Sequence, residues 1–507
     1  MDEHMSTATL DETNTCRILT GGKWVESKAA RFGEITNSST GEVIARVPFC
    51  PADEVGQVVR VAQEAFAEWS EMPAVRRARV MFNFLESLKA SQDEVARLMS
   101  REHGKTLAES KASIQRGMEM VEFACGLPSL LMGETIENIA PDVDCETQRH
   151  PLGVCVGITP FNFPAMVPMW MYPIALVCGN TFILKPSEKV PLSAMRTVEM
   201  LTDAGLPDGA MSLVHGDKEC VDALLTHPLV RAVSFVGSTP VAKYIYETAT
   251  AHGKRVQAAG GAKNHIFIMP DAVLDRSIDA LVGSAFGCAG ERCMAGPLAL
   301  PVGDVADAVV RRLTEAAARI KTGPTDRESD ATMGPLVTRD HQDRVVGYID
   351  RGVAEGARLT LDGRKLSVPE APGGYYVGPT VFDRVEPQMT IAREEIFGPV
   401  LSVVRVKTLE EGIRLTRESE YGNGAVIYTQ SGRAAREFKR RAGAGMIGIN
   451  VGVPAPMAWF SFTGWCRSFF GDLHIQAKEG MLFNTQQKMT MSRWFKDTDG
   501  TLGSWGM

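Results

Sequence analysis

From Leu152 onward the chain alternates short apolar segments with longer amphipathic ones, and this pattern restricts its fold more than any other feature. Five segments are short and apolar, as buried strands are, namely LGVCVGI, TFILKP, MSLVHG, RAVSFVG and RVQAAGG. The stretches between them have the length and pattern of helices. Strands separated by helices of about ten to fifteen residues form βαβ units, in which the strands are parallel. The sequence therefore predicts an α/β fold built on a parallel sheet.

The length of the chain predicts more than one structural unit, because 507 residues exceed the size at which a single hydrophobic core stops growing. A second α/β unit begins near NHIFIMPDA, where a strand leads into the helical segment LDRSIDALVGSAFGCAG. We predict a first lobe from residues 1–132 and 151–258 and a second lobe from residues 259–465. The polar, alternating segments 133–150 and 478–496 are predicted to be exposed strands that pair with another subunit.

Charge and cysteine content argue against several kinds of partner. A net charge of −7 disfavours nucleic acids and anionic membranes, because both require a basic surface. The acidic N-terminal segment MDEHMSTATLDETNTC has no apolar run that would serve as a secretory signal, so a cytoplasmic protein is expected. The ten cysteines include no CxxC pair and no Cys/His cluster with zinc-ligand spacing. We therefore expect reduced thiols and no metal centre.

Three turns follow predicted strands of the first lobe, namely TPFNFP, KPSE and VGST. Open parallel sheets bind ligands at the carboxyl ends of their strands, where these turns lie. The VGST turn stands between an apolar strand and a helix, so Gly237, Ser238 and the free amides of the helix start are predicted to bind a pyrophosphate. No GxGxxG motif follows any strand, which argues against the usual dinucleotide-binding loop.

The segment GCAGERCMAG places Cys293 in a loop just after a helix end. A cysteine in that position is either a nucleophile or a structural thiol, and the residue alone does not decide between them. Six motifs favour the first role. TPFNFP, KPSEK, FVGST, GGAKN, GERCMAG and EEIFGPV occur in the order and approximate spacing found in the aldehyde dehydrogenase superfamily. The chain resembles that superfamily over nearly its whole length.

The resemblance implies a Rossmann-like NAD-binding lobe, an α/β catalytic lobe and a small β element that bridges subunits of a homo-oligomer. It also implies that Cys293 is the nucleophile and that Asn162, with the backbone N–H of Cys293, stabilises the oxyanion, although Asn162 could instead cap the next helix. The implied cofactor-binding residues are Thr159, Phe161, Lys185, Glu188, Gly237, Ser238, Glu395 and Phe397. A carboxylate at Glu188 beside the adenosine ribose would repel a 2′-phosphate, which favours NAD over NADP.

One departure from the superfamily concerns the step after acyl-enzyme formation. Most aldehyde dehydrogenases have ELGGK, with a glutamate that activates water, where this chain has AAGGAK and places Ala258. A thiol such as coenzyme A can attack a thioester without that base. Together with HGDKE, FNFPAMVPMWM and SFFGDLH, this departure makes the chain similar to the CoA-acylating methylmalonate-semialdehyde (malonate-semialdehyde) dehydrogenases. The similarity implies coenzyme A as co-substrate.

The same similarity implies a substrate with a carboxylate, bound by Arg116 and Arg292, because a guanidinium group can bind a carboxylate through two hydrogen bonds. Arg116 could instead be a surface charge, and Arg292 could act by lowering the pKa of Cys293. Two other functions remain open. One is a hydrolytic aldehyde dehydrogenase that releases a free acid, and the other is a catalytically silent relative with a structural or binding role. The sequence does not distinguish malonate semialdehyde from its methylated form, since one methyl group changes binding by only about 1–3 kcal/mol.

Overall fold

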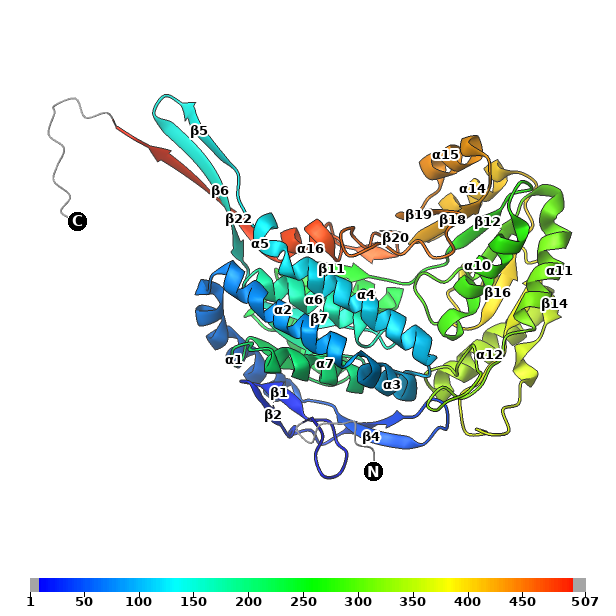
Figure 1. Cartoon of the computed structure of the whole chain (residues 1–507), viewed down its shortest axis with the longest axis horizontal. Helices are drawn as coiled ribbons and strands as arrows, with labels where there is room; N and C mark the ends of the chain where they lie inside the picture. The colour runs from blue at the N-terminus through cyan, green and yellow to red at the C-terminus, as the bar shows by residue number, and fades with distance from the viewer. Residues whose placement is uncertain (1–8, 496–507) are drawn as a thin grey trace.

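The computed structural model describes residues 9–495, so the expectations for residues 1–8 and for residue 496 lie outside the described part. Two lobes lie side by side, each built on its own sheet, and a long arm extends from the first lobe (Figure 1). Short antiparallel sheets complete the molecule. The predicted two-lobed α/β fold with an additional β element is confirmed.

The first lobe is built on an eight-stranded sheet with the order β2-β1-β9-β8-β7-β10-β11-β21. The five central strands, β9 to β11 in that order, are parallel, and the edge strands are antiparallel additions. The strands are β1 (Ile18–Thr20), β2 (Lys23–Val25), β7 (Val154–Ile158), β8 (Thr181–Lys185), β9 (Met211–Leu213), β10 (Val230–Val236), β11 (Arg255–Ala259) and β21 (Phe469–Phe470). Because helices cover both faces, β7 and β8 are buried along their whole length.

Helices form layers on both faces of this sheet. On one face α1, α8 and α9 pack against the strands, and on the other face α6 and α7 do so, with α2, α3 and α4 outside them. The helices are α1 (Ala52–Glu71), α2 (Ala74–Ala90), α3 (Gln92–His103), α4 (Leu107–Cys125), α5 (Leu127–Leu130), α6 (Met166–Val177), α7 (Leu192–Asp203), α8 (Lys218–Thr226) and α9 (Thr239–Ala251). A two-stranded sheet of β3 (Phe32–Thr36) and β4 (Val43–Pro48) borders this lobe.

The second lobe is built on a seven-stranded sheet with the order β14-β15-β16-β13-β12-β18-β19, in which only β14 is antiparallel to its neighbour. Its strands are β12 (His265–Ile268), β13 (Leu298–Pro301), β14 (Arg358–Leu361), β15 (Thr380–Asp383), β16 (Val400–Val403), β18 (Gly424–Tyr428) and β19 (Met446–Ile449). Its helices are α10 (Leu274–Phe286), α11 (Ala306–Ala317), α12 (Arg339–Ala354), α13 (Thr390–Arg393), α14 (Leu409–Glu418) and α15 (Gly432–Arg441). Short 3-10 turns occur at Gly287–Gly290, Gly303–Val305 and Gly363–Lys365.

The boundary between the lobes differs slightly from the predicted one. Strand β11 ends at Ala259, one residue beyond the predicted end of the first lobe. After the second lobe the chain returns, pairs β20 (Trp465–Cys466) with β17 (Tyr421–Gly422), and adds β21 to the first sheet beside β11. The two lobes are therefore joined by two crossings of the chain rather than one.

The arm is a three-stranded antiparallel sheet of β5 (Thr135–Ala140), β6 (Val143–Pro151) and β22 (Thr485–Arg493), and it projects away from both lobes (Figure 1). The prediction that the whole of segment 478–496 is a strand is wrong at its start. The helix α16 (Ala477–Phe483) occupies that part, because its apolar side chains Met481 and Phe483 are buried against the first lobe. The polar alternation that identifies the strand begins only at Thr485.

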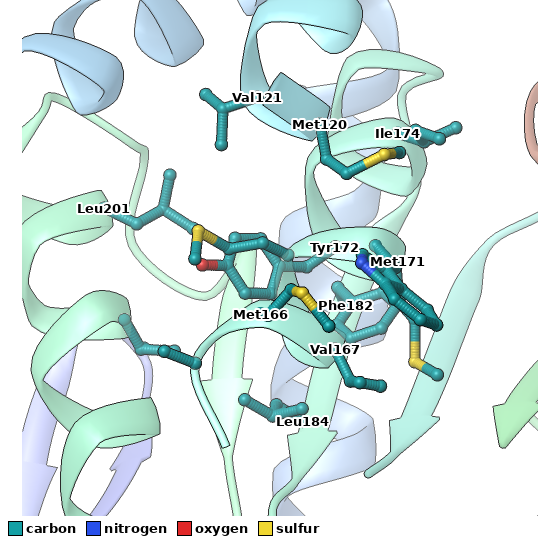
Figure 2. Close-up of a cluster of buried hydrophobic side chains, with 14 of the residues drawn as sticks. Met120, Val121, Met166, Val167, Met171, Tyr172, Ile174, Phe182, Leu184 and Leu201 are labelled. Atoms are coloured by element: carbon teal, nitrogen blue, oxygen red, sulfur yellow. The ribbon is translucent and has the colours of Figure 1, made fainter. Parts of the chain in front are cut away.

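Helix α6 is the centre of the first lobe, and all its residues are buried. Its apolar side chains pack between β7 and β8 on one side and α4 on the other, and Figure 2 shows Met166 and Tyr172 of this helix close to Phe182 of β8. A helix that is apolar on all sides belongs in a core or in a membrane. Within residues 9–495, no helix has both the length and the hydrophobicity needed to cross a bilayer.

Replacing Phe182 by alanine tests this core. The Phe182 side chain is 1% exposed and its ring centroid lies 6.3 Å from that of Tyr172, so Phe182→Ala leaves a cavity. We expect the free energy of unfolding to fall by about 3–5 kcal/mol, measured by denaturant unfolding. Phe82→Ala is the matched control, because Phe82 is 49% exposed and its loss should change the free energy by about 0.5 kcal/mol or less. Equal effects of the two substitutions would contradict this description of the core.

Candidate active site

Cys293 lies in a loop after α10, as predicted, and a strained turn precedes it. In that turn Cys288 and Ala289 adopt left-handed backbone conformations, with φ of 51° and 52°. Such conformations cost about 1–3 kcal/mol per residue and persist only where surrounding contacts fix them. The N–H of Cys288 donates to Glu109 Oε1 on α4 at 2.6 Å. A carboxylate of the first lobe therefore holds the turn that carries the thiol of the second.

Two asparagine side chains that the sequence analysis did not single out fix the main chain of Cys293. The Nδ2 atoms of Asn264 and Asn423 donate to the Cys293 carbonyl at 2.9 and 3.0 Å. Asn264 Oδ1 also accepts from the N–H of Gly424, which ties this contact to β18. Asn264 belongs to the motif GGAKN, whereas nothing in the sequence around Asn423 suggested a role. Both residues orient the nucleophile without touching its sulfur.

The Cys293 thiol is protonated in this environment. Burial raises its pKa to about 12, and the negative charge of Glu395 adds to the shift, whereas Lys105 opposes it. Arg292 is also coupled to this sulfur: although burial opposes the change, the pKa of the guanidinium is raised by Cys288, Glu109 and Cys293. The alternative role of Arg292, lowering the pKa of Cys293, stays a prediction, since burial leaves the pKa of this thiol raised.

Asn162 lies beside the nucleophile loop and is buried. Its Nδ2 donates to the carbonyl of Glu291 at 3.1 Å. The alternative that Asn162 caps the next helix is wrong, because α6 begins at Met166 with Ala165 as its N-cap residue and has no side-chain cap. An amide nitrogen carries two N–H groups, so one remains for a further acceptor. The arrangement leaves a fixed, neutral donor near the thiol.

A cavity of about 430 Å³ contains Cys293, Arg116 and Arg292 in its lining. Apolar side chains form much of the remaining wall, namely Met120, Phe163, Met166, Trp170 and Phe462. Gln476 also lines the cavity, and its buried Oε1 has no hydrogen-bond partner among the described residues. The cavity therefore has the size and character of a small-molecule site in which two cations are placed within an apolar wall.

Each arginine of the cavity is paired with a carboxylate from α4. Arg116 Nη1 donates to Glu119 Oε2 at 2.9 Å, and Arg292 Nη2 donates to Glu109 Oε1 at 3.3 Å. The side chain of Arg116 is 42% exposed and that of Arg292 is 22% exposed, so Arg116 lies nearer the solvent. Arg116 is nevertheless part of the cavity lining, which distinguishes it from an ordinary surface charge.

The predicted cofactor residues of the first lobe gather at one sheet edge, because they follow neighbouring parallel strands. At the end of β8, Lys185 Nζ donates to Glu188 Oε2 at 2.9 Å. Burial alone would raise the pKa of Glu188, but Lys185 lowers it. Ser238, after Gly237, is the N-cap residue of α9 and makes no side-chain bond to the first turn, so the helix-start amides are available to an anion.

Residues from both lobes meet near this edge. The rings of Phe161 and Phe397 are 5.7 Å apart, and Phe397 adopts a left-handed conformation with φ of 62°. Glu395 Oε1 accepts from the N–H of Ala262 at 2.9 Å, and burial raises the pKa of this carboxyl group to about 7. The buried Oγ1 of Thr159 has no hydrogen-bond partner among the described residues, so a bound polar ligand would satisfy it. These groups fit a dinucleotide that spans the edge.

A buried group of ionisable side chains behind the nucleophile was missed by sequence reasoning. The carboxylate of Glu291 accepts from the N–H of Val337 at 3.2 Å and lies within 3.8 Å of His103 and 3.5 Å of His341. Burial raises the pKa of Glu291 to about 8 and lowers that of His341 to about 4. These residues come from three distant parts of the chain. Of these residues, only Glu291 lies within a motif recognised in the sequence, GERCMAG.

A thiol and two arginines thus line one cavity, and the Asn162 amide is fixed against the loop that carries the thiol, which suits acyl transfer through a covalent thioester. Within residues 9–495, no group of three or more His, Cys, Asp or Glu side chains is arranged so that it could hold a metal ion.

Known proteins are similar to this chain in sequence and in fold. The aldehyde dehydrogenase family matches residues 24–490. Malonate-semialdehyde dehydrogenase 3 of Geobacillus kaustophilus is 49% identical over 485 residues, which is 96% of this chain and 100% of that protein. The crystal structure of methylmalonate-semialdehyde dehydrogenase from Oceanimonas doudoroffii has a TM-score of 0.94 and 48% identity, covering 96% of this chain and 99% of that one. A protein of Sinorhizobium meliloti, assigned the same activity and solved with NAD, has a TM-score of 0.94, 44% identity and the same coverages. This chain belongs to the aldehyde dehydrogenase family.

Proposed function

We propose that this enzyme oxidises malonate semialdehyde or methylmalonate semialdehyde with NAD and transfers the acyl group, after loss of carbon dioxide, to coenzyme A. The products are acetyl-CoA or propionyl-CoA and NADH. The observation that carries the proposal is that Cys293 shares one cavity with Arg116 and Arg292. The similar proteins named above act on these two semialdehydes according to their names, and one of the solved structures contains NAD.

The reaction begins when the Cys293 thiol loses its proton to solvent and the resulting thiolate attacks the aldehyde carbon. The free N–H of Asn162 Nδ2 and the backbone N–H of Cys293 stabilise the oxyanion that forms. NAD, when bound, accepts the hydride that leaves this adduct. When NAD is bound, Lys185 and Glu188 hold its adenosine ribose. Gly237 and Ser238 hold its pyrophosphate. In the second lobe, Glu395 holds the nicotinamide ribose and Phe397 packs beside it.

The arginines act on the other end of the substrate. Arg116 and Arg292 hold its carboxylate while the thioester forms, because a fork of N–H donors matches the two carboxylate oxygens. In the thioacyl intermediate the carboxylate is β to the thioester carbonyl. Its C–C bond breaks, carbon dioxide leaves, and the electron pair is delocalised onto the thioester before a proton is added at carbon. The thiolate of coenzyme A then displaces Cys293.

The side chain at position 258 favours a thiol as the acceptor. Ala258 is fully buried in β11 opposite Phe470, and it supplies no group that could activate water. The carboxylates of the cavity, Glu109 and Glu119, are each paired with an arginine. Thiol–thioester exchange requires only a thiolate, so coenzyme A needs no base from this wall.

We also propose that the arm joins copies of this chain. Large apolar side chains on its two outer strands, β5 and β22, are exposed, namely Ile136, Ile139, Met489 and Met491. The strand β6 is paired on both sides, so only the outer strands β5 and β22 could gain a partner strand from another copy of the chain. A homo-oligomer follows from this proposal.

The first test is a product assay with purified enzyme, NAD and malonate or methylmalonate semialdehyde, with and without coenzyme A. We expect sustained NADH formation only with coenzyme A, and acetyl-CoA or propionyl-CoA as the product identified by mass spectrometry. Cys293→Ala should bind NAD without turnover. Equal turnover in the absence of coenzyme A, with a free acid as product, would show that water is the acceptor.

Removing the oxyanion donor tests the role of Asn162. In Asn162→Ala the Nδ2 donor is lost, so kcat should fall by roughly 10²–10³-fold, which corresponds to about 3 kcal/mol. The dissociation constant for NAD, measured by fluorescence titration, serves as the control and should change little. A kcat within about threefold of the native value would rule out Asn162 as the donor.

The burial of Cys293 predicts how its alkylation depends on pH. Since its pKa is raised to about 12, the thiolate fraction rises with pH throughout the accessible range. Modification by iodoacetamide, followed by mass spectrometry of the Cys293 peptide, should accelerate about tenfold per unit from about pH 7 to about pH 9 without reaching a plateau. Cys466 is exposed and provides the internal control for reagent access. A plateau for Cys293 below about pH 8 would show that the resting thiol ionises easily.

A further inference from the structure

We propose that Glu109 is a positioning residue for substrate specificity. Its carboxylate holds the Arg292 guanidinium in the orientation that binds the substrate carboxylate. The inference rests on the proposed function, in which Arg292 contacts that carboxylate. Nothing in the sequence pointed to Glu109, which is a polar residue near the start of α4.

The carboxylate of Glu109 is itself fixed by its neighbours. Oε2 accepts from the N–H of Thr106 at 3.1 Å and from Thr106 Oγ1 at 2.9 Å, which forms a capping box at the start of α4. Oε1 accepts from the N–H of Cys288 at 2.6 Å and from Arg292 Nη2 at 3.3 Å. The side chain is 16% exposed, so little water competes for these bonds. A carboxylate with four donors around it is a rigid support.

Arg292 is held on three sides. Besides the bond to Glu109, Nε donates to Cys288 Sγ at 3.2 Å and Nη1 donates to the carbonyl of Gly283 at 3.4 Å. A guanidinium group has five N–H donors, so these three bonds leave one N–H on each terminal nitrogen without a partner in the described part of the chain. A carboxylate that approaches the end of the guanidinium uses one N–H from each terminal nitrogen.

Gly287 supplies the space that this orientation needs. A Cβ atom at Gly287 would lie 2.5 Å from Arg292 Nη1 and 2.6 Å from Cζ, so the guanidinium packs directly on the glycine. The backbone at Gly287 has φ of −57° and ψ of 139°, which any residue can adopt. An alanine there would therefore displace the guanidinium without straining the turn. The substitution Gly287→Ala therefore displaces the Arg292 guanidinium without changing Glu109.

Helix α4 also fixes the spacing between the two arginines. Glu109 and Arg116 are two helical turns apart, so both side chains lie on one face of α4, and both line the cavity. Through Glu109, the same helix that carries Arg116 determines where Arg292 points. Helix α4 thus fixes the distance between the two guanidinium groups. A substrate with a fixed distance between its aldehyde and its carboxylate requires such a fixed spacing.

The test compares malonate semialdehyde with propanal, in which a methyl group replaces the carboxylate. The measured quantity is the ratio of kcat/KM for the two aldehydes, with NAD and coenzyme A present. General damage to the fold or to Cys293 lowers both values and leaves the ratio unchanged. Loss of carboxylate binding lowers the ratio. We expect Glu109→Ala to lower it by about tenfold or more, and Glu109→Gln, which keeps an acceptor oxygen without the charge, to lower it less.

A double-mutant cycle shows whether Glu109 acts through Arg292. Arg292→Ala should lower the ratio strongly, and adding Glu109→Ala to it should change the ratio by about twofold or less. Gly287→Ala should also lower the ratio, because it moves the guanidinium while Glu109 is intact. Gly347→Ala is the matched control, since a Cβ at that position on α12 meets no atom within 4 Å.

The outcomes separate this inference from the proposed function. If Arg292→Ala lowers the ratio but Glu109→Ala does not, the positioning role is overturned and the proposed function stands. Additive effects in the double variant would also overturn the role, because Glu109 would then act independently of Arg292. If Arg292→Ala leaves the ratio unchanged, the proposed contact between Arg292 and the substrate carboxylate fails, and the role of Glu109 fails with it.

Discussion

The left-handed turn at Cys288 and Ala289 is the constraint on which the site depends, because it reverses the chain between α10 and the nucleophile. Neither residue is a glycine, so the turn is unfavourable by itself and must be maintained by contacts. The bond from the Cys288 N–H to Glu109 supplies one of these contacts from the first lobe, and two asparagines of the second lobe hold the Cys293 carbonyl that follows the turn. The thiol is therefore placed by both lobes together, and its position depends on how they pack.

Much of the fold and part of the site could be predicted from the sequence, for physical reasons that particular residues illustrate. Apolar segments separated by helices identify parallel strands, and the ends of such strands identify the edge that carries Lys185 and Ser238. Motifs of this kind are local in sequence. The contacts of Glu109 and Asn423 join distant parts of the chain, since Glu109 accepts from a backbone N–H 179 residues further along. No local pattern encodes which distant backbone group a carboxylate will hold. The start of segment 478–496 was wrongly predicted to be a strand for the same reason. Its helical conformation depends on burial against the first lobe.

Burial shifts the pKa values of several ionisable groups near the nucleophile towards their neutral forms. It raises the pKa of Glu291 to about 8 and that of Glu395 to about 7, and it lowers the pKa of Lys263 to about 7. An unpaired charge is unfavourable in buried, apolar surroundings. Ionisable side chains there either become neutral or form ion pairs and hydrogen bonds. Arg292 retains its charge because Cys288 and Glu109 accept from it. A substrate carboxylate that enters the cavity thus meets cations in a setting that weakens electrostatic interactions less than water does.

The same apolar surroundings bear on the choice of acceptor. Water attacks a thioester slowly unless a base removes its proton, and Ala258 offers none. The nearest carboxylates of the cavity are bound to arginines, and removing Glu109 from that pairing would expose the strained turn as well as the guanidinium. A thiol acceptor arrives with a much lower pKa than water and needs no such group. We therefore propose that an acyl-enzyme in this cavity is hydrolysed slowly because no unpaired carboxylate among the described lining residues is available as a base, and that the arginine–carboxylate pairs serve substrate binding.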